Sequence, residues 1–422
     1  MATPDTVPHA RTALVLLVDA FRWDYLSAEN TPFLHSQLDS GFLAPLHPIL
    51  GYSDAIRATV FTGAYPRDHG YWIMTKYSPG TSPLKLLKPL RFLDGLPGEF
   101  FQRSMKFWLS ASLGRVLGRI HHCSPPSTHN LPFRLLDRFD STMSKSMLEP
   151  GAFPGYPTIF EMASHRGFKH AFLDASLFGL RARFGSSLRV RGKLVAAVGN
   201  LPQDTRLAFV YLHHLDHFAH RFTTSSPRFI AELRNVDSTI EAIVSKARER
   251  WGSSLEVIIF SDHGMADATH FHDLRELVRD RGLGRDFLLS LDSTMVRVWY
   301  FNPTRRDDVR RRVEALGCGR FLSAEEKQAL KVDFGHRDYG DDIYLLEPGH
   351  TLFPNFISWI KPFAMHAYHP DHPSQTGIFF WLNRRADISH QGPVELVDIA
   401  PSLSTVLGLP PVPTFRGTSL LG

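Results

Sequence analysis

Short apolar runs recur along the chain, and most of them end at a carboxylate or a histidine. They are LVLLV before Asp19, RLAFVYL (206–212) before HHLDHFAH, and LEVIIF (255–260) before Asp262 and His263. A continuous apolar run of this length, bounded by polar residues, is typical of a buried strand. Segments with helical periodicity, such as 158–165 and 225–250, separate the runs. This alternation predicts an α/β fold with a mostly parallel central sheet flanked by helices.

The pattern also predicts elements nearer the two ends of the chain. A helix-like segment follows the first run and continues through Leu38, and a polar turn then leads into a helix that ends at Gly63. An apolar strand at 377–382 follows three histidines, and a last helix ends at Gly408. We expect all of these elements to belong to the central α/β unit.

Two stretches interrupt the alternation and are predicted to be insertions. Residues 76–150 are apolar and basic with frequent Pro and Gly, whereas residues 266–365 mix strand and helix patterns in the manner of a smaller α+β unit. The remaining ranges, 1–75, 151–265 and 366–422, are expected to form the α/β core.

Charge is concentrated in the first insertion. Eight Lys and Arg residues face only two acidic residues between 76 and 122, although the whole chain carries a net charge of only +5. Such a patch favours an anionic partner, whether a phosphate ester, a lipid surface or a nucleic acid, and we expect no specific nucleic acid. Residues 100–120 are predicted to form an amphipathic helix. It would either pack on the core or make peripheral membrane contact through 84–120.

Composition is that of a globular protein, with 43% hydrophobic and 21% charged residues. The two cysteines, Cys123 and Cys318, cannot form a disulfide framework. The N-terminal segment lacks the basic region and cleavage site of a signal peptide, and no apolar run reaches the roughly 18 residues that a spanning helix needs. We therefore expect a cytoplasmic protein.

Seven residues at or near predicted strand ends carry metal-binding or nucleophilic chemistry. They are Asp19, Ser53, Asp216, His220, Asp262, His263 and His366. Asp216 and His220 are four residues apart, so a helical turn would place them on one face. Three carboxylates, three imidazoles and a hydroxyl are about what two divalent ions about 4 Å apart require, and such pairs promote in-line displacement at phosphorus. Taken singly, each Asp or Ser would also fit a plain helix cap.

Several motifs give the chain a family resemblance. VDAFRWDYL, ATVFTGAYPRDHG, LDHFAH, FSDHGM, MHAYHP and VDIAPSLSTVLGLP occur in this order between residues 14 and 421. With them the sequence resembles the alkaline phosphatase superfamily, and most closely its type I phosphodiesterase/nucleotide pyrophosphatase branch. FSDHGM and TGAYPRDHG are specific motifs, whereas MHAYHP is a loose match.

The resemblance implies a binuclear zinc site. Asp216, His220 and His366 would hold one ion, and Asp262, His263 and Asp19 would hold the other, with Ser53 bridging toward the metals as nucleophile. The implied activity is zinc-dependent hydrolysis of phosphodiesters by two in-line displacements through a phosphoseryl intermediate. Coordination of a Ser hydroxyl to Zn²⁺ makes its alkoxide accessible near neutral pH, which agrees with this assignment.

The sequence departs from the branch at the nucleophile and at the phosphate-binding position. The branch usually has Thr in a TFPNH setting where this chain has Ser53, and Thr59 is the alternative nucleophile. Met74 aligns with the expected phosphate-binding Asn, and Arg57 or Lys76 is expected to replace that donor.

The histidine motif departs from the branch as well. Ala367 and His369 stand where the branch usually has Gly and Asp, so His369 or His372 is an alternative to His366.

Several activities use the same site. Phosphomonoesterases, phosphonate hydrolases and phospho-group transferases are alternatives to a phosphodiesterase, because a shared fold does not select among them. A sulfatase is disfavoured, since neither a Cys nor a Ser stands in the C/S-x-P-x-R setting that formylglycine formation requires. An alternative of another class is a non-catalytic protein that binds a ligand or a membrane surface on the same fold.

Overall fold

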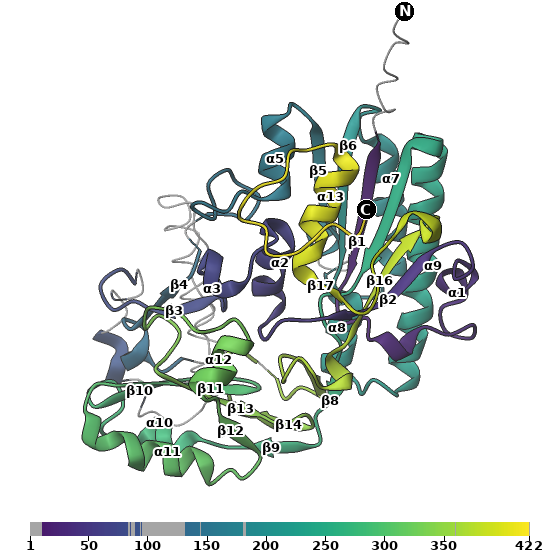
Figure 1. Cartoon of the computed structure of the whole chain (residues 1–422). Coiled ribbons are helices and arrows are strands. Elements are labelled where there is room, and N and C mark those ends of the chain that lie inside the picture. The colour runs from purple at the N-terminus through teal and green to yellow at the C-terminus, as the bar shows by residue number, and fades with distance from the viewer. Residues whose placement is uncertain are drawn as a thin grey trace, which may run out of the picture.

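The computed structural model describes residues 11–82, 85, 89–92, 94, 131–143, 145–179, 183–358 and 360–421. The amphipathic helix expected at 100–120 lies outside these residues, as does most of the proposed membrane-contact segment 84–120. Within the described ranges, a large sheet and a smaller one organise the chain (Figure 1).

The large sheet has seven strands in the described part of the chain, in the order β17-β2-β16-β7-β1-β6-β5. Their bounds are Val394–Glu395, Phe42–His47, Gly377–Leu382, Leu255–Phe260, Thr12–Val18, Thr205–Leu212 and Lys169–Asp174. β5, β6, β1 and β7 pair in parallel, whereas β16 is antiparallel to both of its neighbours. The predicted fold class, an α/β fold with a mostly parallel central sheet, is confirmed.

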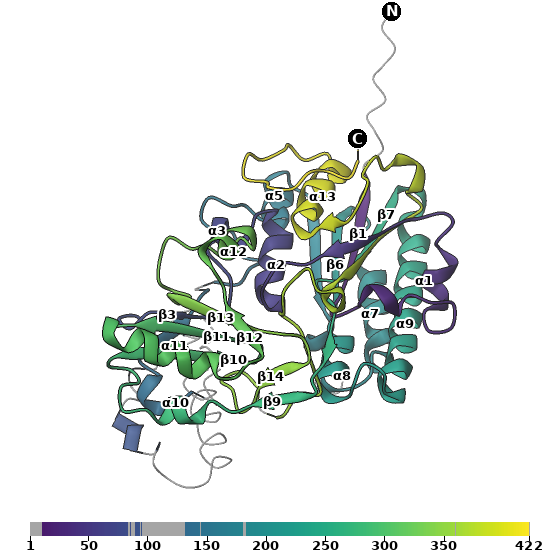
Figure 2. The same ribbon diagram turned by 60° about the horizontal axis from the view of Figure 1, so that its bottom comes forward.

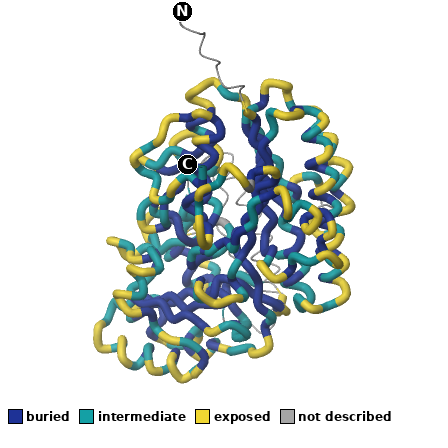
Figure 3. Tube along the Cα trace, turned by 45° about the vertical axis from the view of Figure 1, so that its right-hand side comes forward, coloured by how far each residue is buried: buried dark blue, intermediate teal, exposed yellow. Residues whose placement is uncertain are grey.

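Helices cover both faces of this sheet, which is why every residue of β1 is buried (Figure 1). One face carries α1 (Pro32–Ser36), α7 (Leu188–Asn200) and α9 (Pro227–Trp251). The other carries α2 (Ser53–Thr62), α5 (Ile159–His165) and α13 (Ile399–Leu407). Figure 3 shows the buried strands between these partly exposed helices.

The long helix α9 illustrates how sequence periodicity builds this packing. Ser226 caps its first turn by accepting a hydrogen bond from the N–H of Phe229, and Pro227 takes the first helical position, where no N–H is needed. Phe229, Leu233 and Val236 repeat at helical spacing and are buried against the sheet. Each such side chain contributes roughly 1.5–3 kcal/mol by its burial.

Two segments differ from the sequence-based expectation. The helix expected through Leu38 is reduced to a 3₁₀ turn at Trp23–Tyr25 and the short α1, because Ala20 has a left-handed backbone and Pro32 can only begin a new helix. Strand β2 was not predicted. It contains a proline and takes its position from pairing with β16, more than 300 residues away in the sequence.

The smaller sheet is antiparallel, in the order β10-β11-β13-β12. Its strands are Phe287–Asp292, Met295–Tyr300, Asp342–Leu346 and Gly319–Phe321, and the helices near it are α10 (Arg275–Arg279), α11 (Arg306–Glu314) and α12 (Ala324–Ala329). These elements lie inside 266–365, and the strands of the large sheet lie inside the three core ranges. The exact insertion boundaries stay predictions.

Three short ladders complete the described part of the chain. β14 (His350–Leu352) pairs with β9 (His270–His272), β15 (Ala364–Met365) with β8 (Ala266–Asp267), and β3 (Thr75–Tyr77) with β4 (Phe139–Ser141). Two further short helices are α3 (Pro66–His69) and α8 (His214–Arg221). Within the described ranges, no helix combines the length and apolar composition needed to cross a membrane.

Candidate active site

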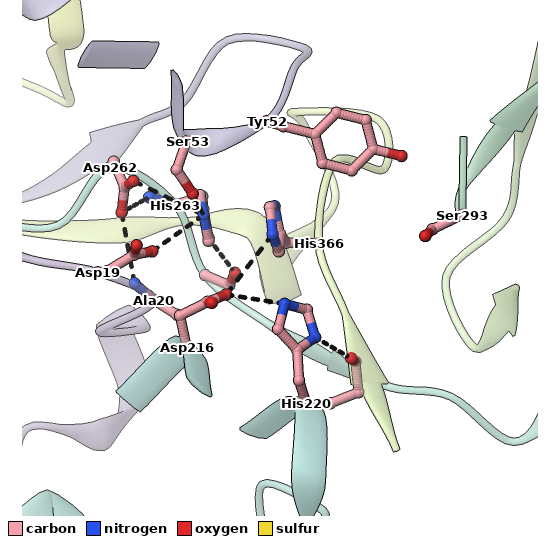
Figure 4. A network of polar contacts seen from close by, with 12 residues as sticks. Asp19, Ala20, Tyr52, Ser53, Asp216, His220, Asp262, His263, Ser293 and His366 are labelled. Carbon is pink, nitrogen blue, oxygen red and sulfur yellow. Dashed lines mark hydrogen bonds and ion pairs between the residues drawn. The ribbon is translucent and has the colours of Figure 1, made fainter. Parts of the chain in front are cut away.

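The carboxyl ends of β1, β6 and β7 meet at one edge of the large sheet, and the predicted site residues gather there (Figure 4). Asp19 directly follows β1, and Asp262 and His263 follow β7 after one intervening residue. Parallel pairing of the three strands makes this convergence unavoidable, since their carboxyl ends must share an edge.

Three further elements bring the other residues to this edge. Helix α8, which follows β6, presents Asp216 and His220, and helix α2 begins at Ser53. His366 directly follows β15. The structure thus brings together all seven residues that the sequence singled out.

One group of potential metal ligands is centred on Asp216. Its Oδ1 lies 3.1 Å from Nε2 of His220 and 3.5 Å from Nε2 of His366. The i, i+4 spacing on α8 places the first two side chains on one face, as the sequence predicted. The three residues offer ligand atoms that all lie within 4.8 Å of one another.

A second group is centred on Nε2 of His263. It lies 3.1 Å from Oγ of Ser53, 3.2 Å from Oδ1 of Asp19 and 3.7 Å from Oδ2 of Asp262. Asp216 is also within reach of this group, since its carboxylate lies within 4.8 Å of the ligand atoms of Asp19 and His263. The imidazoles of the two groups stack, with ring centroids 3.8 Å apart for His263 and His366. The two groups therefore form one continuous cluster.

Burial and mutual repulsion shift the pKa values of the carboxylates in this cluster. Burial, followed by the negative charges of Asp262 and Asp216, raises the pKa of Asp19 well above its usual value. Burial and the charge of Asp216 raise the pKa of Asp262 to about 7. Burial also opposes the charge of Asp216, but His220 outweighs it and holds the pKa of Asp216 below its usual range. His220 thus compensates the charge of Asp216, whereas the charges of Asp19 and Asp262 are not compensated by the protein's own groups.

The donor set fits divalent cations. One oxygen each of Asp19, Asp216 and Asp262 is buried and accepts no hydrogen bond from any residue that the structure describes. Such orphaned oxygens are costly unless a further ligand pairs with them.

Two of the three histidines of the cluster are held with Nε2 facing the carboxylates. Nδ1 of His220 donates to the carbonyl of Ala364, and Nδ1 of His263 donates to that of Gly264, each over 2.8 Å. Because a carbonyl only accepts, each Nδ1 carries a proton and each Nε2 faces the carboxylates. Imidazoles that bind metals are held in this way. Oxygen and nitrogen donors of this kind are those that Zn²⁺ accepts.

Two supporting residues escaped the sequence analysis. The hydroxyl of Tyr211 donates to Oδ2 of Asp19, and Oγ of Ser261 accepts from the N–H of Phe21 while donating to the carbonyl of His263. Their only signal in the sequence is a polar hydroxyl at the end of an apolar run. These contacts fix the carboxylate of Asp19 and the backbone of the Asp262–His263 turn.

Arg57 contacts the ring of Tyr211, whose hydroxyl bonds to Asp19 of the cluster. It lies on α2 four residues after Ser53, hence on the same face of the helix, and its guanidinium carbon lies 5.0 Å from the centre of the Tyr211 ring. Lys76 lies elsewhere, on β3, with its ammonium 3.9 Å from Asp338.

The alternative nucleophile lies away from the cluster. Thr59 is fully buried within α2, and its hydroxyl shares a hydrogen bond of 3.2 Å with Nε2 of His69. Met74, where the branch has its phosphate-binding Asn, is 37% exposed.

The alternative histidines also contact residues outside the cluster. Nδ1 of His369 lies 3.7 Å from Oδ2 of Asp371. The side chain of His372 caps a 3₁₀ turn by accepting a hydrogen bond from the N–H of Ser374. His366, by contrast, is buried between the two groups of ligands.

Two alanines next to the cluster adopt left-handed backbone conformations. Ala20 follows Asp19 with φ of 61°, and Ala367 follows His366 with φ of 63°. Such conformations cost a non-glycine residue roughly 1–2 kcal/mol. In this conformation the N–H of Ala20 donates to Oδ1 of Asp262.

A cavity of about 290 Å³ opens beside His220 and His366. Much of its lining is apolar, with Tyr52, Ile357, Ile360 and Pro362, and Arg221 and His217 supply polar groups. The ring of Tyr52 also meets that of His366 edge to face, with centroids 5.5 Å apart. The cavity is large enough to hold part of a small organic molecule next to the cluster.

The type I phosphodiesterase/nucleotide pyrophosphatase family matches residues 13–350. No curated protein matches the sequence. Among solved structures, inactive murine ectonucleotide pyrophosphatase/phosphodiesterase 5 in complex with AMP superposes with a TM-score of 0.68 at 15% identity, over 98% of this chain and 100% of that one. The human protein of the same name gives 0.65 at 15% identity, over 97% of each chain.

At this identity the structural likeness demonstrates the fold alone. The family match extends over most of the chain and includes every predicted ligand except His366. It supports a hydrolase of the nucleotide pyrophosphatase/phosphodiesterase type, in agreement with the motifs and the Asp/His groups described above. The chain belongs to the type I phosphodiesterase/nucleotide pyrophosphatase family.

Proposed function

We propose that this protein is a phosphodiesterase that uses Ser53 as its nucleophile and two divalent ions, most suitably Zn²⁺. Asp216, His220 and His366 would hold one ion, and Asp19, Asp262 and His263 the other. The observation that carries the proposal is the position of Oγ of Ser53, 3.1 Å from Nε2 of His263. That same nitrogen lies 3.2 Å and 3.7 Å from the unpaired oxygens of Asp19 and Asp262. Bound zinc would stabilise the serine alkoxide and the negative charge on the phosphoryl oxygens in the transition state.

Helix α2 contributes to the reaction through its first turn. Ser53 is the first residue of the helix, so an anion bound there would face the positive end of the helix dipole. Oγ attacks phosphorus, the first alcohol leaves with its oxygen, and a phosphoseryl intermediate remains. Water then attacks the same phosphorus, which restores Ser53 and releases the phosphomonoester.

Arg57 is proposed to replace the phosphate-binding Asn of the branch. Its place on the same face of α2 as Ser53, with its guanidinium over the Tyr211 ring, supports this role. Arg presents its donors in a planar fork that suits phosphate. Lys76, on β3, is less suited, because its ammonium group already lies beside the carboxylate of Asp338.

The cavity next to His366 is proposed to receive one arm of the diester. Its apolar residues and Tyr52 suit a hydrophobic or aromatic group, and Arg221 would meet a further charge. A nucleotide arm is one candidate, since the murine structural neighbour is described in complex with AMP. A lipid-like arm is the other, supported by the basic and apolar composition of 84–120.

The test compares bis-p-nitrophenyl phosphate with p-nitrophenyl phosphate, using zinc-reconstituted protein, Ser53→Ala and the matched variant Thr59→Val. Preferential turnover of the diester is expected, with kcat/KM reduced by at least about 10³-fold in Ser53→Ala, as when other nucleophiles are removed. Thr59→Val should retain the rate, because Thr59 bonds only within the fold at His69.

Other outcomes would redirect the assignment. Preference for the monoester would make the protein a phosphatase with the same site. Loss of turnover in Thr59→Val but not in Ser53→Ala would assign the nucleophile to Thr59 in place of Ser53. Two bound ions without turnover of either ester would favour a non-catalytic, ligand-binding member of the fold.

A further inference from the structure

A second cluster of metal-binding side chains lies outside the active site, where the β9/β14 ladder meets the small sheet (Figure 2). It consists of His272 on β9, His350 on β14 and Cys318 just before β12. The three ligand atoms lie within 4.8 Å of one another, and Nε2 of His272 is 2.9 Å from Nδ1 of His350. None of the three is used in the proposed reaction.

Backbone pairing holds these residues together. β9 and β14 run in parallel, with His272 opposite Leu352. The carbonyl of Cys318 accepts from the N–H of Glu347, and the carbonyl of Glu347 accepts from the N–H of His350. The turn after β13 therefore fixes His350 beside Cys318, while the ladder fixes it beside His272.

We propose that Cys318, His272 and His350 form a second transition-metal site, of the thiolate–imidazole type that selects Zn²⁺. With Zn–S near 2.3 Å and Zn–N near 2.0–2.1 Å, tetrahedral ligands are about 3.3 Å apart for N···N and about 3.6 Å for S···N. The imidazole nitrogens are 2.9 Å apart and all three ligand atoms lie within 4.8 Å of one another, so small side-chain rotations suffice to reach these values. A water would take the fourth position, and the thiol proton would pass to solvent on binding.

The chemistry of this cluster differs from that of the active site. Cys318 is only 2% exposed and is a free thiol, whereas the active-site cluster offers only oxygen and nitrogen donors. A thiolate is a soft ligand that favours Zn²⁺ over Mg²⁺ or Ca²⁺. The ion would join three separate segments, β9, β14 and the start of β12, and would thereby stabilise the small sheet and the adjoining ladder.

Cobalt substitution tests the proposal, because only a thiolate ligand gives Co²⁺ a sulfur-to-metal charge-transfer band in the near ultraviolet. The chain has two cysteines, Cys123 and Cys318, so Cys123→Ser is the matched control. The full-length, cobalt-loaded protein and Cys123→Ser should show the band, and Cys318→Ser should lack it. Metal analysis should show about one ion fewer per chain in Cys318→Ser.

Two further variants keep the result interpretable. His272→Gln leaves the buried thiol in place and should also weaken or abolish the band, which covers the case in which Cys318→Ser does not fold. Asp262→Asn should keep the band, so failure of the proposed active site is distinguishable from failure of this one. Absence of the band from fully loaded wild-type protein, or its loss in Cys123→Ser, would overturn the proposal.

Discussion

Two buried polar clusters in this molecule differ in how far their charges are neutralised by neighbouring groups. In the small sheet, Arg297 is fully buried and directs its guanidinium to both oxygens of Asp292, with further donation to Ser290 and Thr75. At the edge of the large sheet, Asp19 and Asp262 each keep a buried oxygen without a hydrogen bond from any described residue. The first cluster is balanced by its own members, whereas the second is not.

The difference distinguishes a structural ion pair from a binding site. Buried charges are stable where geometry and hydrogen bonds compensate them, as around Arg297. Where carboxylates face one another and the pKa of Asp262 rises to about 7 through burial and Asp216, the compensation must come from outside the chain. The following predictions test this contrast, from the largest expected effect to the smallest.

Asp262→Asn should abolish activity and at the same time stabilise the metal-free protein. The amide removes a proposed ligand, so kcat/KM should fall by about 10⁴-fold, as for other groups that act as a unit with a nucleophile. It also removes one of the mutually repelling charges, so the chelated variant should unfold at a higher temperature than chelated wild type at pH 8. A lower unfolding temperature would contradict the electrostatic interpretation of the cluster.

Arg297→Met should destabilise the protein by about 3–5 kcal/mol, because it leaves the carboxylate of Asp292 buried and unpaired. Urea unfolding provides the free energy of unfolding. The matched double variant, Arg297→Met with Asp292→Leu, removes both charges and should recover most of the loss. Equal destabilisation of the single and double variants would show that packing, and not charge pairing, is the main contribution of Arg297.

The stability of the metal-free protein should depend on pH in a defined direction. The pKa of Asp262 is about 7 in the fold, against about 3.9 for an ordinary aspartate. The folded state therefore binds this proton more tightly, and the contribution of Asp262 to the free energy of unfolding should decrease from about pH 4 to 7 and then level off. Thermal unfolding of chelated wild type and chelated Asp262→Asn at pH 5 and pH 8 isolates this contribution, because the groups that titrate elsewhere in the fold are common to both proteins.

Ala367→Gly should stabilise the protein by up to about 1 kcal/mol. Glycine adopts the φ of 63° without strain, which stabilises the folded state, but it also loses more conformational entropy on folding than alanine. The first effect on the free energy of unfolding is only slightly larger than the second. Calorimetry of the metal-loaded protein measures the change, with Ala364→Gly in the neighbouring strand β15 as a control that should destabilise. Stabilisation by both substitutions would argue against backbone strain as the cause.

The sequence by itself determined the elements whose signal is local. The apolar runs before Asp19 and Asp262 and the periodicity of α9 predict the parallel sheet and its covering helices, because burial of such runs hardly depends on what they pack against. Since parallel strands share a carboxyl edge, the residues that follow them were expected to meet.

Only the tertiary structure decided the features that depend on distant segments. Strand β2 exists through its pairing with β16, and Tyr211 reaches Asp19 from the neighbouring strand. Among the histidines of one motif, His366 joins the cluster and His369 does not, because a left-handed Ala367 turns the chain between them. Nothing local in the sequence brings Cys318 to His272 and His350. That proximity results from pairing between strands far apart in the chain. The free energy of this pairing depends on both partners, so it cannot be inferred from either segment alone.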